Sequence, residues 1–302
     1  MSWLINLIAL FGLLLLVSAL LSPFEAMGWW AGWTRRTLTQ VPSPPPDQGE
    51  VAPYYVVYFT GVAGFSGDFL ARRERGFLER LEAELPGTEV ICDVFPFSVN
   101  NNPLDGDRLL RNLWSWLQAR RLALPNNVFD VLIVVRNMFQ FLVSADRRYG
   151  PVYNLGVARE VARRLRQAGF PVGSGQTLYL LAYSGGAQIA VGAAPFLKQQ
   201  LGCRVEIVAL GGVFSDDEAI EQVDLVHSLR GSRDYWVPDL GALIFPGRWR
   251  FMPYSAWNRT RRAGKIRHLC PGPTTHVGKD DYFSRNQVEN TLPQVVRILR
   301  GH

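Results

Sequence analysis

From residue 53 onward, short apolar runs alternate with longer stretches that carry apolar residues at helical spacing. This alternation predicts an α/β fold, with a mostly parallel sheet that helices bury on both faces. The expected strands are 54–59, 90–95, 129–135, 177–182, 204–210, 225–229 and, as a weaker run, 266–270. The expected helices are 69–85, 105–122, 152–169, 187–201 and 286–300.

The amino-terminal residues 3–21 (WLINLIALFGLLLLVSALL) carry no charge. As a helix they would span about 28 Å, close to the ~30 Å hydrocarbon core of a bilayer. Trp29, Trp30 and Trp33 follow, and tryptophan is typical of the membrane interface. A cleaved signal peptide would need a basic start and small residues before the cut, and both are missing. We therefore expect an uncleaved transmembrane anchor.

Basic residues flank this segment only on its carboxyl side, at Arg35 and Arg36. The positive-inside rule then predicts a single-pass membrane protein whose remaining chain lies on the cytoplasmic side. Three widely spaced cysteines without a CxxC pair also fit a reducing compartment. The expected organisation is an anchor with its interfacial flank (1–36), a proline-rich linker (37–52) and one domain (53–302).

The strongest local motif is LLAYSGGA, residues 180–187, where a predicted strand ends at a serine and a helix begins at once. A nucleophile on such a tight turn needs small neighbours, because strand and helix approach closely. The turn exposes the hydroxyl of Ser184 at the carboxyl end of the sheet. It also directs the N–H of Gly185 toward a developing oxyanion. The alternative is a serine that caps a helix.

This motif resembles the nucleophile elbow of the α/β-hydrolase family, G-x-S-x-G. Ser184 and Gly186 match the pattern, and Ala182 replaces the first glycine. The resemblance extends, more weakly, over residues 53–300. It implies a catalytic serine and a triad in the chain order serine, acid, histidine.

The resemblance also implies an oxyanion loop after the first strand, where TGVAG occupies residues 60–64. The second oxyanion donor would be the N–H of Val62 or Ala63, although an ordinary glycine turn is the alternative. One feature departs from the family. Two strands, 90–95 and 129–135, appear between the oxyanion loop and the nucleophile strand, where the family has one.

Four histidines are candidates for the general base. His302 is terminal, while His227 and His268 lie inside apolar runs, where a structural role is expected. His276 lies on a proline- and glycine-rich loop between the last strand and the terminal helix, as the family's histidine does. We therefore expect His276 to be the base.

The candidate for the acid of the triad also lies just after a predicted strand. Asp234 comes just after the run 225–229 through a glycine turn, which is the family's usual arrangement. Asp216 and Asp217, after the preceding strand, are the alternatives, and Asp217 could equally cap the next helix. The predicted triad is Ser184, His276 and Asp234.

An insertion at 235–265 mixes aromatic residues with arginines and contains a single acid, Asp239. Such a segment can bind single-stranded nucleic acid, rest on an anionic bilayer or cover an active site as a lid. With an anchor upstream, we expect a lid or a bilayer contact and no nucleic acid. A plain solvated insertion is the alternative.

Together these features predict a serine hydrolase that cleaves an ester or thioester, with a lipid as one candidate substrate, through an acyl-enzyme. No dinucleotide, phosphate-loop or metal-ligand motif is present, so no cofactor is expected. The alternative is a catalytically silent hydrolase fold that serves as a membrane-tethered scaffold.

Overall fold

The computed structural model describes residues 51–64, 70–99 and 128–301, together with single helical positions between residues 3 and 27. The predicted membrane segment, its flank, most of the linker and the predicted helix 105–122 lie outside the described residues, apart from those single positions. No helix among the described residues is both long and apolar enough to cross a bilayer.

The core of the structure is a sheet of six strands in the order β2-β1-β3-β4-β5-β6, and every neighbouring pair is parallel. The strands are β1 (Tyr54–Phe59), β2 (Thr88–Ile91), β3 (Thr177–Tyr183), β4 (Arg204–Leu210), β5 (Leu225–Leu229) and β6 (Ile266–Leu269). This arrangement confirms the predicted α/β class with a parallel sheet.

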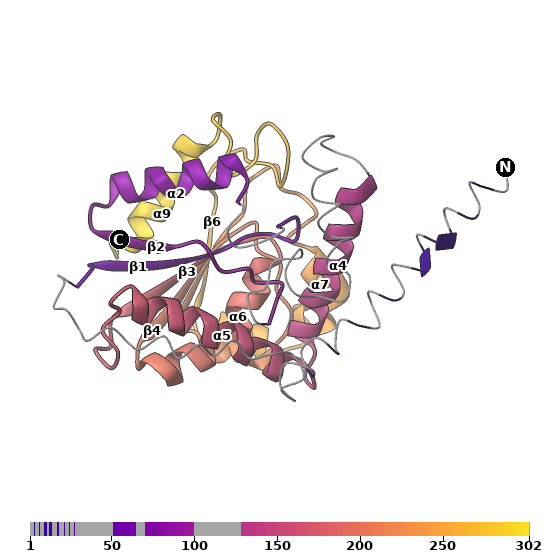
Figure 1. Cartoon of the computed structure of the whole chain (residues 1–302), viewed down its shortest axis with the longest axis horizontal. Helices are drawn as coiled ribbons and strands as arrows, with labels where there is room; N and C mark the ends of the chain where they lie inside the picture. The colour runs from indigo at the N-terminus through magenta and orange to yellow at the C-terminus, as the bar shows by residue number, and fades with distance from the viewer. Residues whose placement is uncertain are drawn as a thin grey trace.

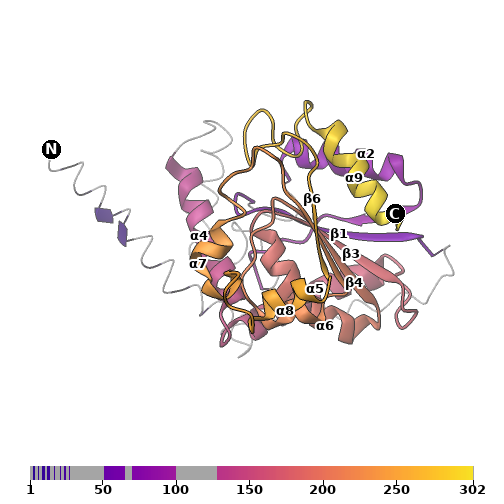
Figure 2. The ribbon, with the colours of Figure 1, turned by 180° about the vertical axis from the view of Figure 1, so that it is seen from behind.

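Helices cover both faces of the sheet (Figures 1 and 2). α2 (Arg72–Glu84) and α9 (Val288–Leu299) pack together on one face. α5 (Gly150–Gln167) and α6 (Gly186–Leu201) lie on the other, and α4 (Val128–Ala145) packs against both. Shorter elements follow β4 and β5: η1 (Glu218–Gln222), α7 (Leu240–Ile244), η2 (Pro246–Arg248) and α8 (Ala256–Arg262).

β1 illustrates why the strands are apolar throughout. Tyr55, Val57 and Phe59 enter the core beneath α4, α5 and α6, whereas Val56 and Tyr58 enter the core beneath α2 and α9. Successive strand residues point to opposite faces, so a strand buried on both sides needs an uninterrupted apolar run.

The predicted strand 129–135 is wrong, because these residues belong to helix α4. The buried side chains Ile133, Asn137, Phe141 and Ser144 recur every three or four residues, which is the helical period. A short apolar run cannot distinguish a buried strand from a buried helix. Only one strand, β2, therefore lies between β1 and β3 in the described chain, and it is displaced toward the amino terminus from the predicted 90–95.

The strand order reverses at one point of the sheet. From β1 the chain first adds β2 on one side and then crosses to β3 on the other. Ligands in open parallel sheets bind where the order reverses, beyond the carboxyl ends of the strands. That point lies between Phe59 of β1 and Ala182 of β3, which pair in register.

Candidate active site

Ser184 directly follows β3 and has a backbone φ of 53°. It is the only non-glycine residue with positive φ in the described part of the chain. Such a conformation costs on the order of 1–3 kcal/mol and persists only where the surroundings hold it. Here its N–H donates to Leu210 O at 3.1 Å and its carbonyl accepts from Val213 N–H at 3.0 Å. The strained turn is therefore fixed to the neighbouring strand β4.

The small residues around Ser184 are required by packing. A Cβ on Gly186 would lie 2.5 Å from the carbonyl oxygen of Thr60 and 2.8 Å from that of Phe59. Any side chain would therefore push α6 away from the end of β1. The close approach of strand and helix expected from the motif is present.

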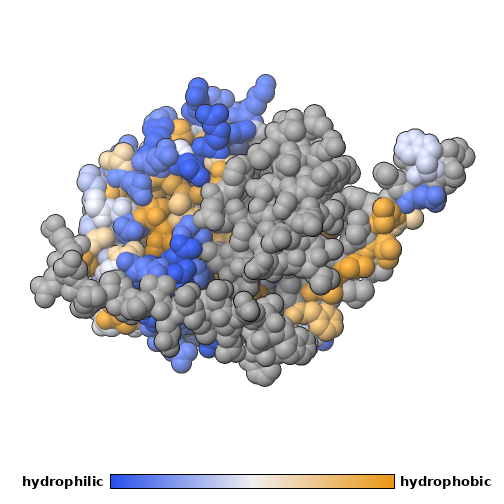
Figure 3. Space-filling view, in the orientation of Figure 1, coloured by the Kyte–Doolittle hydropathy of each residue, from blue (hydrophilic) through white to orange (hydrophobic). Residues whose placement is uncertain are grey.

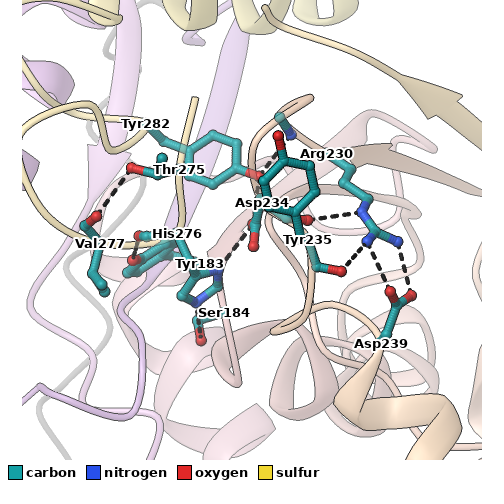
Figure 4. A network of polar contacts seen from close by, with 11 residues as sticks. Tyr183, Ser184, Arg230, Asp234, Tyr235, Asp239, Thr275, His276, Val277 and Tyr282 are labelled. Atoms are coloured by element: carbon teal, nitrogen blue, oxygen red, sulfur yellow. Dashed lines mark hydrogen bonds and ion pairs between the residues drawn. The ribbon is translucent and has the colours of Figure 1, made fainter. Parts of the chain in front are cut away.

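Ser184, His276 and Asp234 form one hydrogen-bonded chain (Figure 4). His276 Nε2 lies 2.9 Å from Ser184 Oγ, and His276 Nδ1 lies 2.9 Å from Asp234 Oδ2. All three residues are buried. They come from the loops after β3, β5 and β6, whose carboxyl ends share one edge of the sheet. The structure thus brings together the three residues predicted from the sequence.

The backbone after β4 passes directly beside this chain. Gly211 has φ of 55°, and a Cβ there would lie 2.8 Å from Asp234 Oδ2 and 2.9 Å from His276 Nδ1. A side chain at this position would separate the acid from the imidazole. Gly211 therefore permits the contact between them.

Two tyrosines that the sequence analysis missed hold the acid and the base. The ring of Tyr183 stacks on the His276 imidazole with centroids 5.2 Å apart, and its hydroxyl donates to the His276 carbonyl. The Tyr282 hydroxyl donates to Asp234 Oδ2 at 2.8 Å and accepts from Gly231 N–H at 2.9 Å. Burial raises the pKa of both phenols well above the ordinary value, so both remain protonated donors.

The loop 60–64 lies over the serine turn. A Cβ on Gly185 would lie 2.7 Å from Val62 Cγ1, so the two predicted oxyanion segments are in contact. The buried Asn137 of α4 fixes this loop, because its Nδ2 donates to Val62 O at 2.8 Å and to Gly64 O at 2.7 Å. Within the described residues, the N–H groups of Val62 and Gly185 donate no hydrogen bond. Both remain candidates to bind an anionic oxygen.

An apolar wall, formed by Val62, Phe97 and Phe141, surrounds the backbone next to the serine. From the position of a Cβ on Gly185, Phe141 Cδ2 lies at 3.5 Å and Phe97 Cζ at 3.9 Å. Phe141 also packs against Phe245, at the end of α7, with ring centroids 6.1 Å apart. The wall therefore connects the surroundings of Ser184 to the insertion.

The alternative acids have other partners. Asp217 caps η1 through the N–H of Ala219 at 2.9 Å and accepts from Gln188 at 3.3 Å. Burial raises the pKa of Asp217, and these two donors lower it. Asp216 lies against Gly247 in the insertion. Neither carboxylate contacts His276 in the described structure.

Neither His227 nor His268 contacts Ser184 in the described structure. His227 is buried on β5 with Nε2 3.1 Å from Glu206 Oε2, which agrees with the expected structural role. His268 lies exposed on β6, and His302 is outside the described residues. Among the described residues, no group of three potential ligands is arranged to hold a metal ion.

A cavity of about 820 Å³ lies between α5, α6 and η1. Asn154, Gly192, Lys198 and Glu218 contribute to its lining, and none of the triad residues does. Because its lining carries both basic and acidic side chains, the cavity indicates no particular class of ligand. It therefore adds nothing to the chemistry at Ser184.

A strained serine, a hydrogen-bonded imidazole and a buried carboxylate can together perform nucleophilic acyl transfer. Comparison with known proteins adds no support to this inference, which therefore depends on the geometry of the site. No family model matches the sequence, and neither the curated proteins nor the solved structures give a significant match.

Proposed function

We propose that this protein is a serine hydrolase of the α/β-hydrolase type, which cleaves a carboxylic ester or thioester through an acyl-enzyme. The observation that carries the proposal is the contact of His276 with both Ser184 and Asp234, each at 2.9 Å, at the strained turn after β3. Serine hydrolases recur on unrelated folds and are recognised by this geometry.

In the acylation step, His276 Nε2 accepts the proton of Ser184 as Oγ attacks the carbonyl carbon of the substrate. The Nδ1–H of His276 donates to Asp234, which fixes the tautomer and stabilises the imidazolium. The tetrahedral intermediate collapses when its C–O or C–S bond breaks. The imidazolium then gives its proton to the leaving alcohol or thiol.

In the second step, water attacks the acyl carbon while His276 takes one of its protons. The second intermediate collapses, Ser184 Oγ leaves, and it recovers its proton from His276. Each tetrahedral oxyanion would accept from the N–H of Gly185 and from that of Val62 or Ala63. One such donor contributes roughly 10²- to 10³-fold in turnover.

The test is labelling of the purified protein with a fluorophosphonate, which modifies activated serines. We expect the wild type to be labelled and Ser184→Ala to lose the label, with turnover of a soluble ester falling on the order of a millionfold. Ser215→Ala is the matched control. Ser215 is equally buried, but its Oγ accepts from Asp217 N–H and it lies outside the triad.

Labelling that persists in a folded Ser184→Ala protein would place the nucleophile elsewhere. A folded wild type that is neither labelled nor active on ester and thioester panels would instead support the silent scaffold.

We also propose that residues 3–21 anchor the protein in a membrane with its domain on the cytoplasmic side. The support is the uncharged span and the position of Arg35 and Arg36 behind it.

A further inference from the structure

The described domain exposes its aromatic side chains in one region. Among the described residues from 51 onward, every exposed phenylalanine, tyrosine and tryptophan lies between residues 235 and 254. Tyr235, Trp236, Phe251 and Tyr254 are 70%, 67%, 70% and 85% exposed, and Leu243 is 75% exposed. We call these five residues the insertion surface. Soluble proteins rarely concentrate large apolar side chains outside the core, so such a surface indicates an interaction.

The backbone beneath this surface is fixed. The buried Asn258 carboxamide donates to Trp249 O at 2.7 Å and to Met252 O at 3.0 Å. Trp249 donates to Ala242 O at 2.7 Å, and its ring lies 5.2 Å from that of Phe251. The segment therefore has hydrogen-bonded structure of its own, which holds the exposed rings outward.

The arginines around this surface fall into two groups. In the first, Arg248 stacks over the buried Trp257 at 3.9 Å and donates to Phe214 O. Burial lowers the pKa of Arg248 to about 10. Arg259 is neutralised by Glu221 at 2.5 Å. These two arginines stabilise the insertion and do not supply free surface charge.

The second group comprises Arg250, Arg261 and Arg262. Arg250 and Arg262 are exposed and Arg261 is half-exposed. None of the three has an ion pair with a carboxylate in the described structure, and Arg262 donates to the carbonyl of Pro253. The insertion surface thus combines exposed aromatic rings with uncompensated positive charge.

The opposite face of the sheet differs in character. α2 and α9 lie there, away from α7 and α8 (Figures 1 and 2). Figure 3 shows hydrophilic side chains over α2, where Arg72, Glu79 and Glu82 are exposed. The described residues of α2 therefore lack the exposed aromatic side chains that the insertion carries.

We propose that the insertion surface rests on the headgroup region of an anionic bilayer. Tyrosine, tryptophan and phenylalanine partition to that region, and arginine is attracted to anionic lipid. The charge complementarity and the uncharged residues 3–21 of the same chain favour a membrane over a protein partner. Because Phe245 links α7 to the apolar wall beside Ser184, this contact would bring the site close to the lipid. The docking itself does not depend on the chemistry of Ser184.

The test uses the full chain in nanodiscs of phosphatidylcholine with and without phosphatidylserine. An environment-sensitive fluorophore is attached through Phe251→Cys, with the exposed Cys270 replaced by serine. We expect blue-shifted, brighter emission only when phosphatidylserine is present. The same fluorophore on Ala83→Cys, exposed on α2, should not respond.

Charge variants make the test specific. Arg250→Gln with Arg262→Gln should lower the ratio of docked to undocked protein about fivefold per arginine, or roughly twenty-fivefold for the two. Salt near 1 M should have a similar effect, because it shortens the Debye length to about 3 Å. The control pair Arg72→Gln and Arg297→Gln, on α2 and α9, removes the same charge from the other face and should leave docking unchanged.

A fluorophore at residue 251 that stays in water on both lipids would overturn the proposal and leave a protein partner for this surface. An equal response on both lipids would overturn the requirement for anionic lipid. Neither result concerns the serine hydrolase proposal, because fluorophosphonate labelling tests that separately.

Discussion

The phenol of Tyr282 donates to the same oxygen of Asp234 that contacts His276, at 2.8 Å and 2.9 Å respectively. Tyr282 also accepts from Gly231 N–H, at the turn that delivers Asp234 from β5. One hydroxyl therefore orients the carboxylate and moderates its negative charge. Because burial raises the pKa of this phenol above its ordinary value, the donor persists at alkaline pH.

We expect Tyr282→Phe to retain the fold and to lower kcat roughly tenfold with little change in KM. A hydrogen bond to a charged group is worth about 1.5–3 kcal/mol. Without the phenol, the Asp234 carboxylate loses a donor that orients it, so it holds the His276 imidazole less well for proton transfer. A loss of kcat that disappears when the variant and the wild type are compared at matched thermal stability would assign Tyr282 a purely structural role.

The acid is tested by comparing two conservative variants. Asp234→Asn should reduce turnover by roughly ten-thousandfold, because the amide holds the wrong histidine tautomer. Asp217→Asn should have little effect on turnover, since Asp217 caps η1 and asparagine is an equally good cap. Turnover is measured on proteins of matched thermal stability. The reverse ranking would move the acid to the loop after β4.

The triad could be predicted from the sequence because each member closely follows a strand. Carboxyl ends of parallel strands meet at one edge, so Ser184, Asp234 and His276 converge once the strands are assigned. Tyr282 could not be predicted in the same way. Its partners lie 48 and 51 residues away in sequence, and only the folded loops bring them together.

Asn137 was missed for a different reason. The strand predicted at 129–135 ended the element just before this residue, which therefore appeared to lie in a loop. In α4 it points inward with Phe141, one helical turn later, and both are buried.

The environment of Arg248 in the insertion was also missed in the sequence. The sequence pattern gave no reason to separate Arg248 from the other arginines of the insertion, whereas in the structure its guanidinium stacks on Trp257 and donates to Phe214 O.

Asn137→Ala should lower kcat by up to roughly a hundredfold with KM nearly unchanged, because the loop carrying Val62 loses its support. The free energy of unfolding should fall by about 1–3 kcal/mol, since the carbonyls of the half-buried Val62 and Gly64 lose their donor. Asn258→Ala is the matched control, because Asn258 is another buried carboxamide that donates to backbone carbonyls. Equal losses of kcat in the two variants would show that Asn137 acts only through stability.

The predicted anchor is tested by fractionation. The full chain should stay with membranes after carbonate extraction, and a reporter fused after His302 should be cytoplasmic, because Arg35 and Arg36 follow the uncharged span. Removing residues 1–40 should release the domain from the carbonate-resistant fraction. Recovery of a chain that begins near residue 27 would instead show a cleaved signal peptide, which would reverse the compartment.

The apolar wall yields a prediction about the acyl group. Phe141 lies beside the turn that carries Ser184, so an acyl chain bound to the serine oxygen is expected to contact its ring. Phe141→Leu removes volume there and should cost about 1–2 kcal/mol in stability. A pocket of this kind discriminates by roughly tenfold or more per methylene. The ratio of kcat/KM for long over short acyl esters should therefore rise roughly tenfold.

Phe170→Leu is the control for Phe141→Leu. Phe170 is equally buried, but it packs on Tyr55 with ring centroids 4.9 Å apart, near the start of β1. This variant should lose comparable stability and leave the chain-length ratio unchanged, because the amino-terminal end of the sheet is remote from Ser184. If both variants shift the ratio alike, the preference reflects loosened packing of the whole domain. If neither does, the acyl chain binds away from Phe141, and the wall only shields the triad from water.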